Sequence, residues 1–197
     1  FITDDSGRDD LVEHVYDVTY GTVKPGIDKL VIIDDSIVRG TTLKRSILRI
    51  LDRLLPAEII VVSSSPQIRY PDCYGIDMAR LADFIAFQAV IDLLRETGKS
   101  SLINDVYRKC KEQQNKHRNE IVNHICELYA PFTDEQISDR IAAILQPGIK
   151  AKVKAVFQTV DNLHKACPND LGDWYFTGNY PTPGGNRVVN TAFINYI

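Results

Sequence analysis

Two adjacent carboxylates, Asp34 and Asp35, directly follow the run KLVII (29–33). That run is typical of a strand buried on both faces of a parallel sheet. Ligands of open α/β sheets lie at the carboxyl ends of the strands, so we expect both aspartates at a binding edge. Neighbouring carboxylates can accept hydrogen bonds from vicinal hydroxyls, or hold hydrated Mg²⁺ through one or two oxygens. The pair therefore predicts a site for a diol, for Mg²⁺, or for both.

The turn that follows, Arg39-Gly40-Thr41-Thr42, has the residue types of a phosphate site. We expect a helix to begin at about Thr42, and the free amides and dipole of a helix N-terminus favour a phosphate. Gly40 lets the backbone approach a ligand closely, and the two threonines add hydroxyl donors. One loop thus offers acceptors for a diol and donors for a phosphate, which suits ribose 5-phosphate.

A purely structural interpretation of this loop takes the aspartates as a strand end and a helix cap. Two other phosphate loops are excluded, because the segment contains neither the Walker A pattern GxxxxGK[ST] nor the dinucleotide pattern GxGxxG. The complete string VIIDDSIVRGTT (31–42) is more specific than an Asp-Asp pair alone. We therefore favour the ribose-phosphate interpretation.

The elements around the loop predict a βαβ unit. A strand at 29–33, a helix at 42–55 ended by Pro56, and a strand at 58–62 follow one another within about 35 residues. Further along we expect a loop at 63–77, helices at 80–97, 100–128 and 149–163, and an irregular tail after Cys167-Pro168. Thr133 and Gln136 predict a capping box for one more helix. Residues 1–24 should form a loop that leads into a short helix or an irregular segment.

Bulk composition indicates an ordinary globular protein of 197 residues, with 44% hydrophobic and 25% charged residues. The net charge of −3 gives no reason to expect a nucleic acid as partner, and no apolar run approaches a membrane span. No signal peptide is visible, and the four cysteines are far apart, so we expect reduced thiols and a cytoplasmic location. The chain lacks an initiator Met, which predicts a piece of a longer protein.

Three strings carry a resemblance to a known family. VIIDDSIVRGTT resembles the motif that binds phosphoribosyl diphosphate (PRPP) in type I phosphoribosyltransferases, and its wording DDSIVRGTT is similar to that of amidophosphoribosyltransferases. YPDCYGIDM (70–78) and FTGNYP (176–181) are similar to later stretches of the same family, in the same order. The resemblance implies part of a type I phosphoribosyltransferase fold, a parallel sheet flanked by helices, followed by a helical region and an irregular tail.

The resemblance also implies roles for the loop residues. Asp34 and Asp35 would bind the ribose hydroxyls of PRPP and contribute to a Mg²⁺ site. The 5-phosphate pocket would be lined by Ser36, Arg39, Gly40, Thr41 and Thr42. The family's reaction replaces the diphosphate of PRPP with an amino group from glutamine, giving 5-phosphoribosylamine in the first step of purine biosynthesis. Residues from Phe1 onward would be the trailing part of a mobile loop that closes over PRPP.

The chain departs from the family in two ways. The glutaminase domain that supplies ammonia and the first part of the transferase fold are absent, so we expect no catalytic residue here and no activity of this piece alone. Gly172 and Tyr175 stand where an iron–sulfur CxxC would be, and Cys73 is one place from the expected ligand position. We therefore predict no iron–sulfur cluster.

We expect three regions: the C-terminal part of the transferase domain (1–98), a helical extension (99–165) and a tail (166–197). Homo-oligomers and feedback by purine nucleotides are expected from the family. Two alternatives stay open, namely a phosphoribosyltransferase for nucleobase salvage and a non-catalytic regulator that binds PRPP.

Four further features have ordinary structural interpretations. We take the basic stretch 109–118 as a solvated helix face, and His117 with His124 as an incomplete metal site. Trp174 should pack in the protein, and Cys73 should be a buried or partly buried thiol rather than a nucleophile.

Overall fold

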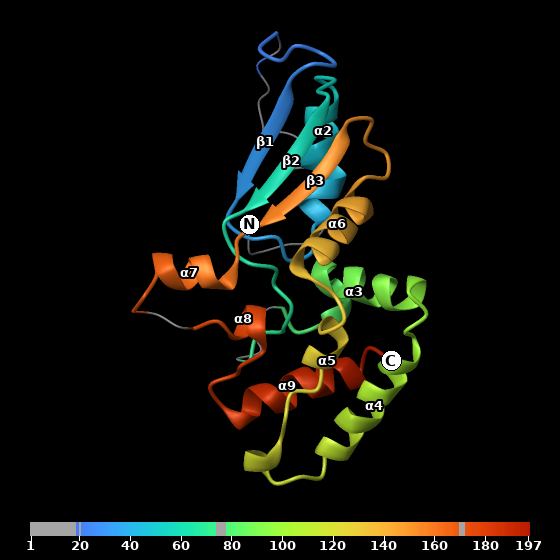
Figure 1. Cartoon of the computed structure of the whole chain (residues 1–197), viewed down its shortest axis with the longest axis vertical. Coiled ribbons are helices and arrows are strands. Elements are labelled where there is room, and N and C mark those ends of the chain that lie inside the picture. The colour runs from blue at the N-terminus through green and yellow to red at the C-terminus, as the bar shows by residue number, and fades with distance from the viewer. Residues whose placement is uncertain (1–18, 20, 74–77, 170–171) are drawn as a thin grey trace.

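The computed structural model describes residues 19, 21–73, 78–169 and 172–197 (Figure 1). At its centre three parallel strands pair in the order β1 (Lys29–Asp34), β2 (Glu58–Ser63), β3 (Lys152–Phe157). At their carboxyl ends Asp34, Ser63 and Phe157 are in register. The α/β class with a parallel sheet flanked by helices is therefore confirmed. Most of residues 1–24, where we expect a loop leading into a short helix or an irregular segment, lies outside the described residues.

The connection from β1 to β2 is helical, as its periodicity predicts. It begins with a π-helical turn, η1 (Leu43–Ile47), and continues as α2 (Leu48–Asp52). Leu43 and Leu48 are buried in the core. The helix ends three residues before the predicted end at 55, where Leu55 has a positive φ of 55°.

The remaining helices of the described residues are η2 (Leu81–Asp83), α3 (Ile85–Glu96), α4 (Ser101–Gln113), η3 (Arg118–Glu120), α5 (Cys126–Tyr129), α6 (Asp134–Leu145), α7 (Val160–Ala166), α8 (Trp174–Thr177) and α9 (Pro183–Ile194). The capping box of α6 is confirmed, with Thr133 and Gln136 exchanging two hydrogen bonds. Gly98 follows α3 with a φ of +70°, as a C-terminal glycine should. Within the described residues no helix is long and apolar enough to cross a membrane.

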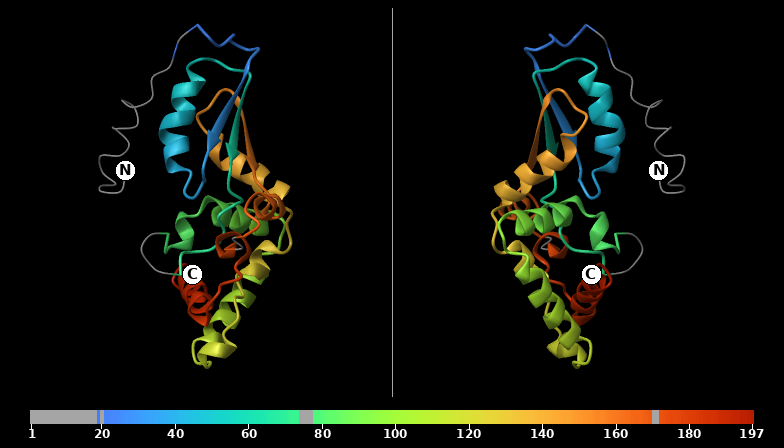
Figure 2. Two further views of the ribbon diagram at one scale, coloured as in Figure 1. Left: turned by 90° about the vertical axis from the view of Figure 1, so that its left-hand side faces the viewer. Right: turned by 90° about the vertical axis from the view of Figure 1, so that its right-hand side faces the viewer.

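Helices of the described residues cover one face of the sheet. Ile59, Val61 and Val153 point into the core, which α3 and α6 complete. In Figure 1 helix α2 lies behind the strands, and the turned views of Figure 2 show it on one side of them. Among the described residues, no helix lies over the opposite face.

The predicted helix at 149–163 is wrong for its first half, which forms β3. Val153, Val156 and Phe157 fit helical spacing, but the same segment also alternates with period two. Val153 and Ala155 are buried, whereas Lys152 and Lys154 are exposed. The open edge of β2 decides between the two patterns, because pairing there satisfies the backbone of this β-branched segment. β3 thus joins the sheet from within the predicted extension 99–165, and the division into regions stays a prediction.

The predicted long helix at 100–128 is interrupted after α4. Between α4 and α5 the backbone finds side-chain partners instead of helical ones. Gln113 Oε1 accepts from the Val122 amide at 3.1 Å, and Asn123 Oδ1 accepts from the Ile125 amide at 2.9 Å. Such side-chain bonds offer the backbone an alternative to the helix, and spacing of apolar residues does not reveal them.

The predicted irregular tail contains helices α8 and α9. Gly184 and Gly185 indicate a loop by propensity, yet Pro183 is compatible with the first turn of a helix. Packing stabilises α9, since Val189 and Phe193 are fully buried. Tertiary contacts therefore override the weak local preference.

Candidate functional site

The loop after β1 is held by backbone bonds to the strand beside it. The amides of Ser64 and Ser65 donate to the carbonyls of Asp34 and Asp35 at 2.9 and 3.0 Å. The Asp35 amide donates to Asp34 Oδ1 at 3.0 Å, and the Ser36 amide donates to Asp35 Oδ1 at 2.8 Å. These bonds fix both carboxylates at the carboxyl edge of the sheet.

Ionisation of Asp34 is disfavoured at this edge of the sheet. Partial burial raises the pKa of Asp34, and the hydrogen bond and the negative charge of Asp35 raise it further, although the Asp35 amide acts in the opposite direction. An acid with a raised pKa binds its proton more tightly when folded, so ionised Asp34 costs stability at neutral pH. A cation or hydroxyl donors at this edge would offset that cost.

The turn into the helix requires a glycine. Gly40 has a φ of +67°, and a Cβ at this position would lie 2.6 Å from Ile85 Cδ1. The Lys44 amide donates to the Gly40 carbonyl at 2.9 Å, which is a helical hydrogen bond. The amides of Thr41 and Thr42 come before Lys44 and therefore belong to the first turn of the helix. First-turn amides have no intrahelical partner, which makes them donors for an anion.

Residues 80–85 support the loop from the side, although they are not among the residues predicted for the site. The Ile85 amide donates to the Val38 carbonyl at 2.8 Å. Arg39 Nε lies 3.9 Å from Asp83 Oδ2, which also pairs with Arg80 at 3.0 Å. No local motif marks these positions, because only the tertiary fold brings η2 to the loop.

The predicted site residues run from the last residue of β1 through the loop into the first helical turn: Asp34, Asp35, Ser36, Arg39, Gly40, Thr41 and Thr42. Thr41 is exposed, and the Asp35 side chain lies at the surface. The roles assigned to them in ligand binding stay predictions.

The other two similar strings lie against each other, far apart though they are in sequence. The amides of Arg69 and Tyr70 both donate to the Tyr175 carbonyl, at 2.8 and 3.1 Å. Tyr180 Oη donates to the Pro71 carbonyl at 2.6 Å, and burial raises the pKa of Tyr180 far above its ordinary value. The C-terminal tail thus packs against the segment after β2, and we call these contacts of Tyr175 and Tyr180 the tyrosine clasp. Residues 74–77 of the second string lie outside the described residues.

A cavity of about 410 Å³ opens beside this clasp, at the carboxyl ends of β2 and β3. Its lining includes Gln67, Phe157 and Phe176. Gln67 is buried, donates to Ser138 Oγ at 2.8 Å and accepts from Arg69 at 2.7 Å. The polar side chains of Gln67, Arg69 and Ser138 in this lining are therefore already hydrogen-bonded to one another.

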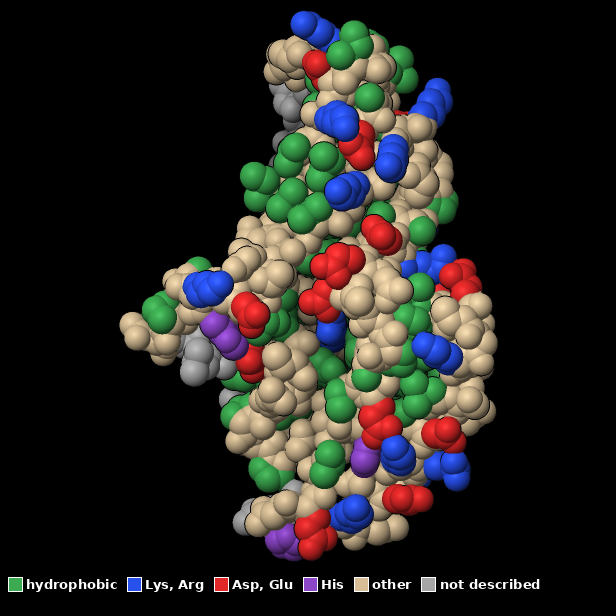
Figure 3. Space-filling view, viewed as in Figure 1, with side chains coloured by type: hydrophobic (Ala, Val, Ile, Leu, Met, Phe, Trp, Pro, Cys, Tyr) green, Lys and Arg blue, Asp and Glu red, His purple; other side chains and the backbone are tan. Residues whose placement is uncertain are grey.

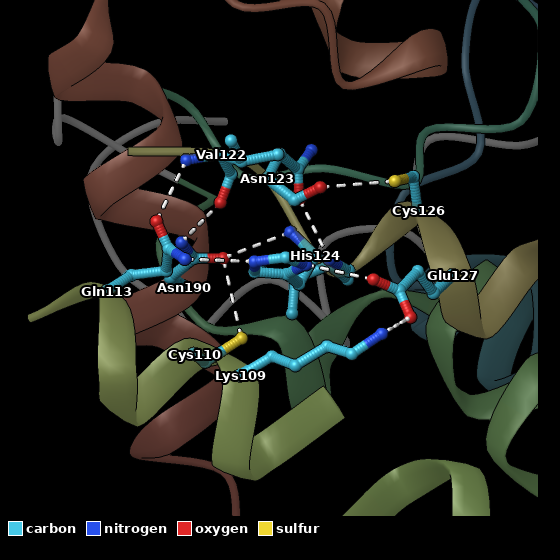
Figure 4. Close-up of polar contacts among 10 residues, drawn as sticks. Lys109, Cys110, Gln113, Val122, Asn123, His124, Cys126, Glu127 and Asn190 are labelled. Carbon is cyan, nitrogen blue, oxygen red and sulfur yellow. Dashed lines mark hydrogen bonds and ion pairs between the residues drawn. The ribbon is translucent and has the colours of Figure 1, made fainter. Parts of the chain in front are cut away.

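The cysteines and histidines form no metal site in the part of the chain that the structure describes. All four cysteines are free, and no group of three or more potential ligands could hold a metal ion there. Both ring nitrogens of His124 are engaged, with Glu127 at 2.8 Å and Gln113 at 3.0 Å (Figure 4). Lys109 pairs with Glu127 at 2.6 Å, so part of the basic stretch belongs to an internal network. The absence of an iron–sulfur cluster stays a prediction.

Comparison with known proteins returns one family repeatedly. The amidophosphoribosyltransferase of Pseudomonas aeruginosa is 40% identical over 138 residues, which is 67% of this chain and 27% of that protein. Those of Pyrococcus horikoshii and Escherichia coli are 40% and 36% identical over 75 residues, or 38% of this chain. This chain is related to amidophosphoribosyltransferases over part of its length.

The relationship to amidophosphoribosyltransferases is partial in both directions. The matched segments span only 15% of the E. coli protein, 16% of the Pyrococcus protein and 27% of the Pseudomonas protein. No family model matches the chain. No solved structure matches it either.

Proposed function

We propose that the chain is the part of an amidophosphoribosyltransferase that binds the ribose 5-phosphate end of PRPP. The complete enzyme would convert PRPP and glutamine-derived ammonia to 5-phosphoribosylamine and diphosphate. The partial relationship to that family supports the proposal. Ammonia would come from a domain outside these 197 residues, and catalysis would require that domain and the missing transferase segments.

The observation that carries this proposal is the pairing of two kinds of group on one loop. The Asp34 and Asp35 carboxylates supply hydrogen-bond acceptors for the two ribose hydroxyls. Ser36, the backbone at Arg39 and Gly40, and the hydroxyls of Thr41 and Thr42 supply donors at the start of the helix. A sugar carrying a phosphate has the matching groups at its two ends.

The residues present fit a magnesium ion held together with substrate. Mg²⁺ in nucleotide sites is bound by one or two carboxylates, and substrate oxygens and waters complete its shell. Asp34 and Asp35 supply these two carboxylates, and their mutual repulsion favours a cation. Bound there, Mg²⁺ would neutralise charge that develops on the leaving diphosphate.

Calorimetric titration of the chain with PRPP and Mg²⁺ tests the proposal. The double variant Asp34→Asn/Asp35→Asn should lose binding at least tenfold, since it keeps the shape but removes both charges. Asp105→Asn on α4, an exposed carboxylate of the helical region, should bind like the wild type. The double variant should stay folded, because ionised Asp34 already costs stability at neutral pH.

Three results would contradict the proposal. If neither this chain nor the full-length protein binds PRPP, the assignment of the loop is wrong. If the full-length protein transfers the phosphoribosyl group to a free nucleobase, it is a salvage enzyme. PRPP binding without any transfer in the full-length protein would instead support a regulator.

A further inference from the structure

Arg39 is the only basic residue in the stretch from Asp34 to Thr42, where it follows two carboxylates. The chain as a whole has a net charge of −3, and Figure 3 shows Lys and Arg side chains interspersed with Asp and Glu side chains on one face. Binding of a phosphate at this loop therefore depends on cations held close to it rather than on an overall positive field. The orientation of the Arg39 side chain, which is 33% exposed, thus matters for the site.

Asp83 faces Arg39 from η2, and backbone bonds hold it there. The Asp83 amide donates to the Arg80 carbonyl at 3.1 Å, within the η2 turn. Two residues later the Ile85 amide donates to the carbonyl of Val38, the residue before Arg39, at 2.8 Å. These bonds fix the position of the Asp83 backbone relative to the loop. A short aspartate side chain on a fixed backbone has little freedom to move its carboxylate away.

One oxygen of Asp83 lies between two guanidinium groups. Asp83 Oδ2 is 3.9 Å from Arg39 Nε, and it is 3.1 and 3.0 Å from Nε and Nη2 of Arg80. Two positive charges and one negative charge give these three side chains a net charge of +1. Asp83 can therefore orient Arg39 without making the surroundings of the turn negative, which would repel a phosphate.

The two arginines contact this carboxylate differently. Arg80 is hydrogen-bonded to Asp83, whereas the 3.9 Å between Asp83 and Arg39 exceeds the length of a hydrogen bond. A phosphate at the turn would therefore meet Arg39 without breaking a direct hydrogen bond between these two side chains. A guanidinium carries five N–H donors in one plane, so Arg39 can face a carboxylate and a phosphate at the same time.

We propose that Asp83 is a positioning residue of the phosphate site. Its carboxylate orients Arg39 towards the 5-phosphate of the sugar, and Arg80 keeps the group of three side chains positive. This inference rests on the proposed function, because the loop must bind a ribose 5-phosphate group for Arg39 to contact it. The alternative is that Asp83 only stabilises η2 through Arg80, and then its effect on binding would not depend on Arg39.

Calorimetric titration of the full-length protein with ribose 5-phosphate and with PRPP, each in the presence of Mg²⁺, tests the inference. Asp83→Asn should raise the Kd about three- to tenfold for both ligands, because both carry the 5-phosphate. Asp83→Glu restores the charge and should recover most of this loss. Asp105→Asn is the matched control, since Asp105 and Arg108 form a similar pair on α4. It should leave both dissociation constants unchanged.

A double-mutant cycle with Arg39 separates positioning from a general effect on the fold. Arg39→Gln alone should weaken binding of both ligands. In the Arg39→Gln background, Asp83→Asn should cause no further loss, because no guanidinium is left to orient. Equal losses in both backgrounds would mean that Asp83 acts only on η2, and would overturn the inference. Tighter binding by Asp83→Asn would also overturn it, because the charge of Asp83 would then repel the phosphate.

The outcomes distinguish this inference from the proposed function on which it rests. If the wild-type full-length protein binds neither ligand, both are wrong. If it binds both ligands and Asp83→Asn binds them equally well, only the positioning role is wrong. A loss confined to PRPP would place Arg39 at the diphosphate, and the role of Asp83 at the 5-phosphate would again be wrong.

Discussion

Gly40 occupies a position where two physical constraints exclude a side chain. Its φ of +67° is a conformation that residues with a Cβ rarely adopt, and Ile85 fills the space that the Cβ would need. The same Ile85 donates its amide to the loop carbonyl of Val38. One residue of α3 therefore determines both how the loop turns and how closely its backbone can approach a ligand.

Gly40→Ala should destabilise the protein by about 2–4 kcal/mol, with about 1 kcal/mol from the backbone conformation and the rest from the clash. Gly98→Ala is the matched control, since Gly98 has a φ of +70° and no atom within 4 Å of the added Cβ. It should cost only about 1 kcal/mol. Urea unfolding of both variants measures the difference.

Removal of Cδ1 by Ile85→Val in the Gly40→Ala background should recover the clash component and leave the backbone component. If Gly40→Ala and Gly98→Ala lowered the free energy of unfolding equally, the contact between Gly40 and Ile85 would contribute nothing to stability.

At the scale of elements, α9 depends on the fit of its first turn. Gly185 faces the ring of Tyr180 so closely that a Cβ would overlap it, whereas Gly184 faces open space apart from Thr182 Oγ1 at 3.6 Å. Tyr180 in turn bonds to Pro71 in the segment after β2. The position of α9 is thus coupled through one tyrosine to a string near the carboxyl edge of the sheet.

Substitution of the two neighbouring glycines should have opposite effects. Gly184→Ala should stabilise the protein by up to about 1 kcal/mol, because alanine favours the helix. Gly185→Ala should destabilise it by about 1–3 kcal/mol, because Tyr180 must move. Thermal unfolding measures both signs. Stabilisation by both variants would show that Tyr180 adapts without cost.

At the scale of the whole molecule, the C-terminal tail completes the core. Phe193 is fully buried and meets the ring of Phe87 at 6.1 Å, and Tyr196 meets the same ring at 4.9 Å. Asn190 joins α9 to the segment between α4 and α5 by a bond to the Val122 carbonyl at 2.8 Å (Figure 4). The last helix therefore contacts elements from two of the three predicted regions.

A chain that ends at residue 165 should lose its cooperative unfolding transition, since the Phe87 cluster and the tyrosine clasp are both removed. Phe193→Ala in the intact chain should cost about 3–5 kcal/mol but keep a single transition. Urea unfolding followed by near-ultraviolet circular dichroism distinguishes the two. A truncated chain that unfolds cooperatively would instead support the predicted boundary at 165.

The accuracy of the sequence-based predictions differs between segments for physical reasons. β1, β2 and the helix between them follow from strong apolar patterns bounded by polar residues and Pro56, and the capping box follows from two side chains three residues apart. β3 and α9 do not, because the segment of β3 fits two periods and α9 has two glycines in its first turn. Long-range pairing with β2 and packing on Phe87 resolve both cases.

The sequence by itself determined the local chemistry of the candidate loop: two carboxylates at a strand end, then a glycine and two threonines at a helix start. Those features depend on neighbours within twelve residues, which the order of the chain already specifies. Only the tertiary structure decided that Ile85 and Asp83 support this loop, that the tail packs against the segment after β2, and that β3 joins the sheet beside β2. These are contacts between residues distant in sequence, and packing rather than local preference selects them.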